Sequence, residues 1–132
     1  MNYEVKLPWV VSGGAPPPEP IAKSEWGPRG WAWLHTQAIN YAAHPTKIDQ
    51  AAMFARFWSF IQRLPCEECR MHATKYARQY PPDFSGSAGF QTWAWRFHNA
   101  VNYRLGKSLV TAEEYRGLYA EETAASYWKY VV

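Results

Sequence analysis

Proline and glycine divide residues 26–120 into segments of helical length. Within each segment, apolar residues recur three and four positions apart, which is the spacing of one face of an α-helix. The alternation of apolar and polar residues that is typical of a half-buried strand does not persist anywhere in this stretch. The sequence therefore predicts an all-α fold, a four-helix bundle plus a short fifth helix.

The first two predicted helices are bounded by proline and by a capping residue. Pro28 suits the first turn of the first helix, where its missing N–H costs nothing. His44-Pro45 ends this helix, because a residue before proline is driven out of the α region. Thr46 is expected to cap the second helix, with Asp49 in its first turn.

The remaining helices follow from similar signals. Pro65 is expected to start the third helix, which carries both cysteines in its first turn and continues to about residue 79. The fourth runs from about residue 88 to 105, with Gly106 as a C-cap. Thr111-Ala112-Glu113-Glu114 is a capping box for a short fifth helix ending near Ala120. The predicted buried faces comprise Trp31, Leu34, Ala38, Tyr41, Ala52, Met53, Phe57, Phe60, Ile61, Leu64, Phe90, Trp93, Phe97, Ala100, Val101 and Leu105.

The chain has 132 residues, enough for one compact domain. Residues 1–24 combine Gly13-Gly14 with a proline-rich run and are expected to form an arm. The folded domain is placed at residues 25–120, followed by a tail at residues 121–132. The net charge of +3 comes from well-mixed charges, so nucleic-acid binding is not expected. No apolar run approaches the roughly 20 residues of a membrane span, and no export signal is seen.

The two cysteines form one Cys66-x-x-Cys69 motif. A disulfide that closes so short a loop adds little stability, so the pair is expected to serve chemistry. If Pro65 starts the helix, Cys66 lies among unpaired backbone N–H groups at the positive end of the helix dipole. A thiolate is stabilised there, and the thiolate is the reactive form of cysteine.

Two interpretations of the motif stay open from the residues alone. The first is a redox disulfide in a helical frame. The second is a zinc-stabilised interaction module with Cys66, Cys69 and His72 as ligands and a further histidine as the fourth. Covalent haem attachment is excluded because Arg70, not histidine, follows the second cysteine. A thioredoxin-type site requires a βαβ frame, which the sequence does not show.

The redox interpretation requires an electron acceptor, because no side chain stores two electrons for onward transfer. The chain has 8 Trp, 9 Tyr and 6 Phe, which suit either an aromatic core or a slot for a flat cofactor. A Gly-x-Gly-x-x-Gly motif is absent, so a flavin would have to enter the mouth of the bundle.

Five motifs, in order from Trp26 to about Tyr119, give the chain a specific resemblance. They are Trp26-Gly27-Pro28-x-x-Trp31-x-x-Leu34-His35, Pro45-Thr46, Pro65-Cys66-x-x-Cys69-x-x-His72, His98-Asn99-x-Val101-Asn102 and Leu105-Gly106-Lys107. The sequence resembles the Erv/ALR-type sulfhydryl oxidases. This resemblance implies a five-helix fold that binds FAD and forms homodimers.

The resemblance also implies roles for individual residues. The residues expected at FAD are Gly27, Trp31, His35, Tyr41, Cys69, His72, Trp95, His98, Asn99, Val101, Asn102, Lys107 and Tyr119. An ordinary core position remains an alternative for Trp31, Trp95 and Val101. In the implied mechanism a substrate thiolate attacks Cys66, Cys69 leaves as a thiolate and passes electrons to FAD, and oxygen takes them to give hydrogen peroxide.

The sequence departs from cellular members of this family in ways that suggest a branch. The second, shuttling cysteine pair is missing, Pro28 stands where arginine is common, and Ala42 stands where proline is usual. This compact layout is similar to the virus-encoded members. It implies a cysteine-containing substrate or a small dithiol or thioredoxin-like relay protein, in the cytoplasm of an infected cell or in the virion. A flavin-free adaptor that keeps the fold for dimerisation is a further alternative.

Overall fold

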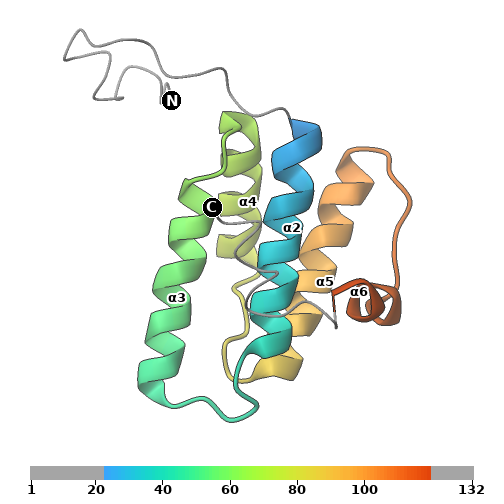
Figure 1. Ribbon diagram of the computed structural model, residues 1–132. Coiled ribbons are helices and arrows are strands. Elements are labelled where there is room, and N and C mark those ends of the chain that lie inside the picture. The colour runs from blue at the N-terminus through green and yellow to red at the C-terminus, as the bar shows by residue number, and fades with distance from the viewer. Residues whose placement is uncertain (1–22, 120–132) are drawn as a thin grey trace, which may run out of the picture.

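The computed structural model describes residues 23–119, which form five helices and no strand (Figure 1). The helices are α2 (Lys23–Asn40), α3 (Lys47–Gln62), α4 (Glu67–Gln79), α5 (Ser87–Arg104) and α6 (Ala112–Tyr119). The all-α prediction, with four long helices and a short fifth, is confirmed. The predictions for the arm and the tail concern residues that lie almost entirely outside the described part.

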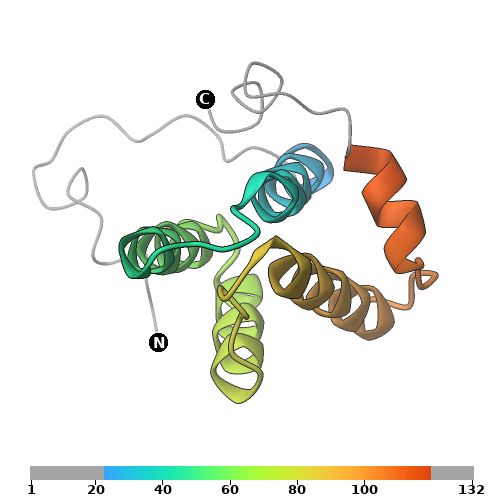
Figure 2. The same cartoon turned by 90° about the horizontal axis from the view of Figure 1, so that it is seen from below.

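The helices are arranged around α2. It packs mainly against α5 and also contacts α6, while α3 packs against α4. Seen along the bundle, the four long helices surround the core, and the short α6 crosses outside α2 and α5 (Figure 2). The mouth of the bundle lies where α4 begins and α5 ends (Figure 1).

The predicted capping motifs are confirmed. The hydroxyl of Thr46 accepts from the backbone N–H of Asp49, and the Asp49 carboxylate accepts from the backbone N–H of Thr46, both at 3.0 Å. The same exchange joins Thr111 and Glu114 ahead of α6. Gly106 follows α5 with a φ of 72°, a left-handed conformation that favours glycine. These bonds satisfy backbone groups that a helix end leaves unpaired.

Two predicted helix starts were wrong by a few residues. Helix α2 begins at Lys23, so Pro28 lies inside it. Proline removes the bond to the residue four positions earlier and crowds its carbonyl, but here that residue is in the first turn, so only one turn of helix lies upstream of the disruption. Helix α4 begins at Glu67, because Cys66 has extended backbone angles and takes the N-cap position that was expected further upstream.

The core is built from the predicted helical faces. Leu34, Phe57, Ile61 and Phe90 are fully buried, with Trp93 beside them. Two predicted core residues, Ala52 and Leu105, are exposed instead. Ala52 faces outward because α3 lies at the edge of the bundle and buries only a narrow stripe. Leu105 is the C-cap of α5 and lies beyond its last packed turn.

The start of α5 is joined closely to the end of α2. The hydroxyl of Ser87 donates to the carbonyl of Ala38 at 2.7 Å, and the backbone N–H of Ser87 donates to the carbonyl of Ala42 at 3.0 Å. A Cβ atom on Gly86 would lie 2.6 Å from the carbonyl oxygen of Ala43, closer than real Cβ contacts. Glycine is therefore required where these two chain segments meet.

We expect Gly86→Ala to destabilise the protein by about 1–3 kcal/mol, because backbone must move to admit the methyl group. Gly117→Ala is the matched control. A Cβ there has no atom within 4 Å, and alanine in a helix is favoured over glycine by about 0.5–1 kcal/mol. Urea unfolding of the two variants measures both effects. Equal unfolding midpoints for Gly86→Ala and the unmodified protein would contradict the expected clash.

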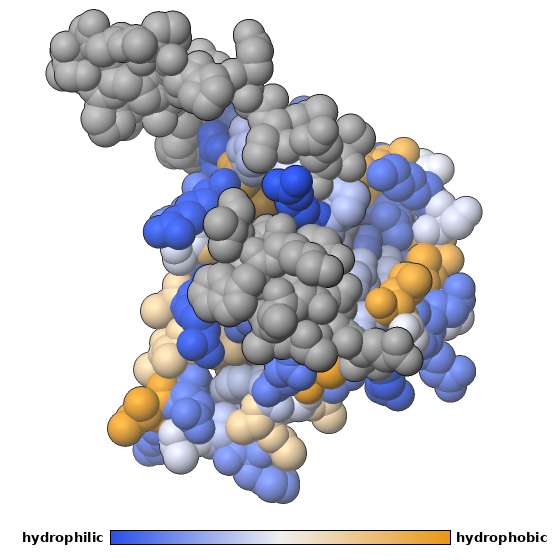
Figure 3. Space-filling view, viewed as in Figure 1, coloured by the Kyte–Doolittle hydropathy of each residue, from blue (hydrophilic) through white to orange (hydrophobic). Residues whose placement is uncertain are grey.

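The described surface shows separate hydrophobic areas. On the face in Figure 3, strongly hydrophobic residues lie in small patches between hydrophilic ones. Among residues 23–119, no helix combines the length and the apolar character that a membrane crossing requires.

Candidate active site: a dithiol at the mouth of an aromatic cavity

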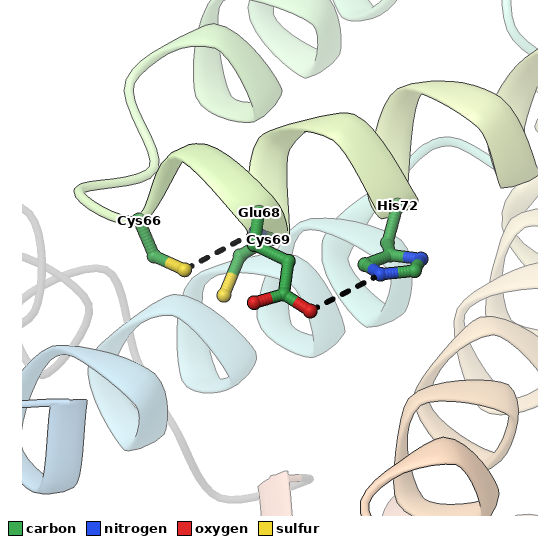
Figure 4. Close-up of polar contacts among 4 residues, drawn as sticks. All are labelled: Cys66, Glu68, Cys69 and His72. Atoms are coloured by element: carbon green, nitrogen blue, oxygen red, sulfur yellow. Dashed lines mark hydrogen bonds and ion pairs between the residues drawn. The ribbon is translucent and has the colours of Figure 1, made fainter.

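The two cysteines lie at the first turn of α4. The sulfur of Cys66 accepts from the backbone N–H of Cys69 at 3.2 Å, so it occupies the capping position usually held by an oxygen. Both sulfurs point to the same side of the helix (Figure 4). Because this backbone N–H and the helix dipole both favour negative charge, a thiolate at Cys66 is stabilised.

Arg70 fixes the segment ahead of the dithiol. Its guanidinium donates from Nη1 to the carbonyl of Leu64, and its backbone N–H donates to the carbonyl of Cys66 at 2.9 Å. These bonds connect the end of the α3–α4 loop to the first turn of α4. The loop beside the two sulfurs is thereby held in place.

Glu68 and His72 form a pair one turn apart on the same side of α4 (Figure 4). Glu68 Oε1 lies 3.6 Å from His72 Nε2. The described residues contain no group of three or more His, Cys, Asp or Glu side chains arranged to hold a metal ion. The zinc alternative, with Cys66, Cys69 and His72 as ligands, therefore has no support.

A cavity of about 550 Å³ opens beside Cys69 and lies within the usual range for small-molecule and cofactor sites, ~300–1,000 Å³. Cys69 contributes to its lining, whereas Cys66 lies outside the lining. The walls combine aromatic and aliphatic groups with a few polar ones. The lining residues are Trp26, Gly27, Pro28, Gly30, Trp31, Phe60, Leu64, Cys69, His72, Ala73, Phe97, His98, Val101, Asn102, Arg104, Leu105 and Lys107.

Polar and cationic groups gather on the α5 side of this cavity. His98 and Asn102 are both 8% exposed. Arg104 and Lys107, at the end of α5, add two cations. The result is a cavity with flat apolar walls, a polar edge and positive charge at one end. That combination suits a flat ligand that carries anionic groups.

His98 is held by a second buried histidine. Nδ1 of His98 and Nε2 of His35 lie 2.8 Å apart, so one ring donates and the other accepts. Burial lowers the pKa of His35 to about 4. Burial, with the nearby His35 and Lys107, lowers the pKa of His98 to about 3. Both rings are therefore neutral at physiological pH.

Aromatic rings enclose this histidine pair. Trp31 stacks on His98 with ring centroids 3.6 Å apart and 6° between the planes. On the other side, Tyr119 of α6 stacks on His35 at 4.7 Å. His35 and Tyr119 do not line the cavity themselves. His35 is bonded to His98 and Tyr119 is stacked on His35, both outside the lining, and their contacts with a cofactor stay a prediction.

Three further residues expected at the cofactor also lie outside the cavity lining. Trp95 and Asn99 both donate to the carbonyl of Val110, each at 2.7 Å, and so hold the loop before α6. Tyr41 donates its hydroxyl to the carbonyl of Phe84 at 2.7 Å, near the opposite end of α2. These three side chains stabilise loops in the described structure.

The structure also adds lining residues that the sequence did not indicate. Phe60, Leu64 and Phe97 were predicted only as core, and they form walls of the cavity. Arg104 was not singled out, although it lies on the turn of α5 that follows Val101. The cations at Arg104 and Lys107, three residues apart near a helix end, were the available signal.

The fold and this site define a class: small helical redox proteins in which a dithiol opens onto a cavity for a flat cofactor. The chain belongs to the Erv1 / Alr family, whose family model matches residues 28–122. An FAD-linked sulfhydryl oxidase of African swine fever virus is 36% identical over 96 residues, which cover 73% of this chain and 81% of that protein.

Two further comparisons agree with this assignment. A probable FAD-linked sulfhydryl oxidase of Acanthamoeba polyphaga mimivirus is 31% identical over 97 residues, which cover 71% of this chain and 68% of that protein. The crystal structure of the FAD binding domain of Erv1 from Saccharomyces cerevisiae has a TM-score of 0.72 at 25% identity. That match covers 76% of this chain and 95% of the yeast chain.

Proposed function

We propose that this protein is an FAD-dependent thiol oxidase, which forms disulfide bonds in a substrate protein and passes the electrons to oxygen to give hydrogen peroxide. The observation that carries the proposal is the position of the two sulfurs. Cys69 lines the aromatic cavity and Cys66 lies outside its lining, at the N-cap of α4. One sulfur can therefore meet a substrate while the other meets a cofactor.

The cavity has the chemistry that FAD requires. The ring system needs flat apolar walls, which Trp26, Trp31 and Phe97 provide. The diphosphate needs positive charge, which Arg104 and Lys107 provide. When bound, FAD supplies a two-electron acceptor that oxygen reoxidises. Gly27, His72, His98, Val101 and Asn102 complete the proposed cofactor-binding set within the lining, with His35, Trp95, Asn99 and Tyr119 supporting it from outside.

The protein's own sulfurs carry the exchange with substrate. A substrate thiolate attacks Sγ of Cys66, so a bond forms between these two sulfurs and the Cys66–Cys69 bond breaks. Cys69 leaves as a thiolate at the cavity wall. A second substrate thiolate then attacks the substrate sulfur, which releases an oxidised substrate and Cys66 as a thiolate. The backbone N–H of Cys69 stabilises that thiolate, and the pair now holds the two electrons of the substrate.

Several finer assignments belong to the same proposal. The oxidase domain comprises residues 25–120, flanked by an arm and a tail. The electron donor is a cysteine-containing substrate or a small dithiol or thioredoxin-like relay protein. We place the protein in the cytoplasm of an infected host cell or in the virion, as a virus-encoded homodimer. Support for a viral source comes from the similarity to the two viral oxidases, and support for a dimer comes from the family resemblance.

The proposed function is tested by the visible absorption spectrum of the purified full chain. We expect a yellow flavin spectrum that bleaches when excess dithiol is added without oxygen and returns when air is admitted. Hydrogen peroxide should form in proportion to the thiol consumed. A colourless protein that takes up no added FAD would overturn the proposal, and a bound flavin that dithiol cannot bleach would overturn the thiol-oxidase assignment.

A further inference from the structure

Tyr115 of α6 contacts the polar edge of the cavity from behind. It is only 4% exposed and is not part of the cavity lining. Its ring stacks on His98 with centroids 4.4 Å apart and on His35 at 4.6 Å. Its hydroxyl lies 3.0 Å from Nδ2 of Asn102. One side chain from outside the cavity therefore contacts two of its polar lining residues, His98 and Asn102.

The direction of the hydrogen bonds in this cluster starts from a backbone group. Asn99 Nδ2 donates to the carbonyl of Val110 at 2.7 Å, and the backbone N–H of Val110 donates to Asn99 Oδ1 at 3.0 Å. A backbone N–H can only donate and a backbone carbonyl can only accept. The amide of Asn99 is therefore fixed, with Oδ1 as an acceptor.

The fixed amide of Asn99 sets the direction of the Tyr115 hydroxyl. Tyr115 Oη lies 3.4 Å from Asn99 Oδ1, and because that oxygen only accepts, the hydroxyl hydrogen points toward it. At 3.4 Å this bond is long, so it sets direction more than it adds energy. The free lone pair of the hydroxyl then accepts from Asn102 Nδ2 at 3.0 Å.

The orientation of the Asn102 amide follows. Its Nδ2 is turned toward α6, so Oδ1 lies on the other side of the amide. Within residues 23–119, this oxygen has no hydrogen-bond partner, while Asn102 lines the cavity. Because Asn102 lines the cavity and is 8% exposed, an acceptor there is open to a ligand that brings a donor.

We infer that Tyr115 is a positioning residue, which turns the carbonyl oxygen of Asn102 into the cavity to accept a hydrogen bond from an N–H or O–H group of the bound cofactor. The inference rests on the proposed function, since the cofactor is taken to be FAD. It assigns α6 a part in cofactor binding, although Tyr115 does not line the cavity. The backbone of Val110 fixes the amide of Asn99, which sets the direction of the Tyr115 hydroxyl. That hydroxyl in turn sets the orientation of the Asn102 amide at the cavity.

The test is Tyr115→Phe in the full chain, which removes the hydroxyl and keeps the ring stacked on both histidines. We expect FAD to bind about 3- to 10-fold more weakly, because the Asn102 amide loses the partner that holds it. The matched control is Tyr103→Phe, the same change at an 80% exposed position on α5, which should leave the dissociation constant unchanged. Flavin fluorescence on titration of the FAD-free protein measures both constants.

A double-mutant cycle separates positioning from a general loss of structure. If Tyr115 acts through Asn102, then Tyr115→Phe should weaken FAD binding less than about 2-fold in an Asn102→Ala background. A merely structural hydroxyl would weaken binding by the same factor in both backgrounds. An equal effect in both backgrounds, or no effect in the first, would overturn the inference.

The orientation itself is read without FAD, from the side-chain amide signals of Asn99 and Asn102 in ¹H–¹⁵N NMR spectra. Tyr115→Phe should shift the Asn102 amide pair more than the Asn99 pair, which loses only a long bond of 3.4 Å, whereas Tyr103→Phe should shift neither. Unmoved Asn102 signals would overturn the positioning role. Failure of the unmodified protein to bind FAD would overturn the proposed function separately, and the NMR comparison would still decide whether Tyr115 orients Asn102.

Discussion

Replacing Cys69 with alanine is expected to lower thiol-dependent oxygen consumption by at least about 10³-fold while FAD remains bound. Cys69 is the sulfur that lines the cavity, and Cys66 cannot form the disulfide without it. The cofactor should stay, because the flat walls and the cations belong to other residues such as Trp31 and Lys107. An oxygen electrode gives the rate, and the flavin absorbance per protein gives the occupancy.

Met71→Ala is the matched control for this change. Met71 lies on the same helix, is 55% exposed and is outside the cavity lining, so both the rate and the flavin content should persist. A Cys69→Ala protein that consumes oxygen at a rate near that of the unmodified protein would show that electrons bypass the cysteine pair. Loss of flavin together with activity would instead show that the thiol is needed to build the cavity.

Features of the fold that depend only on residues close together in the sequence could be predicted from the sequence. The capping boxes at Thr46 and Thr111 form within four residues, so their composition is enough to locate them. The upstream start of α2 could not be predicted in the same way, since a proline at position 28 is compatible with the first turn or with a position just inside the helix. Exposure of Ala52 depends on where α3 lies in the bundle, which periodicity does not specify.

In the candidate site, too, the residues that belong to local motifs could be predicted, and those that depend on helix packing could not. Cys69, His72, His98, Asn102 and Lys107 were expected at the cofactor from motifs, and all five line one cavity.

Asn99 and Tyr115 show the limit of motif reasoning. Asn99 was also expected at the cofactor, which stays a prediction. Its amide is held by Val110, a contact between loop and helix that the motif does not encode. Tyr115 follows a capping box and resembles any apolar position of a short helix. Its contact with Asn102 exists only after α6 packs across α2 and α5.

The buried histidine pair is expected to make the FAD-free protein lose stability in mild acid. The pKa of His35 is lowered to about 4 and that of His98 to about 3, from 6.5 in an unfolded chain. As the pH falls below about 6.5, His35 and His98 bind protons in the unfolded chain, whereas in the folded protein both rings stay neutral. This contribution to stability is therefore complete above about pH 6.5 and falls progressively between about pH 6.5 and about pH 4, at up to about 1.4 kcal/mol per pH unit for each histidine.

The measurement is the urea unfolding free energy of the FAD-free protein between pH 7.5 and pH 5, a window above the range in which most carboxylates titrate. His35→Gln keeps a hydrogen-bond partner for His98 and removes one titrating ring, so the loss per pH unit should fall by about half. His44→Gln changes an exposed histidine that is not part of the pair, and its profile should match the unmodified protein. The expected loss comes from two rings that the folded protein keeps neutral. A flat profile between pH 7 and pH 5 would therefore show that folding does not lower their pKa values, and would contradict the prediction.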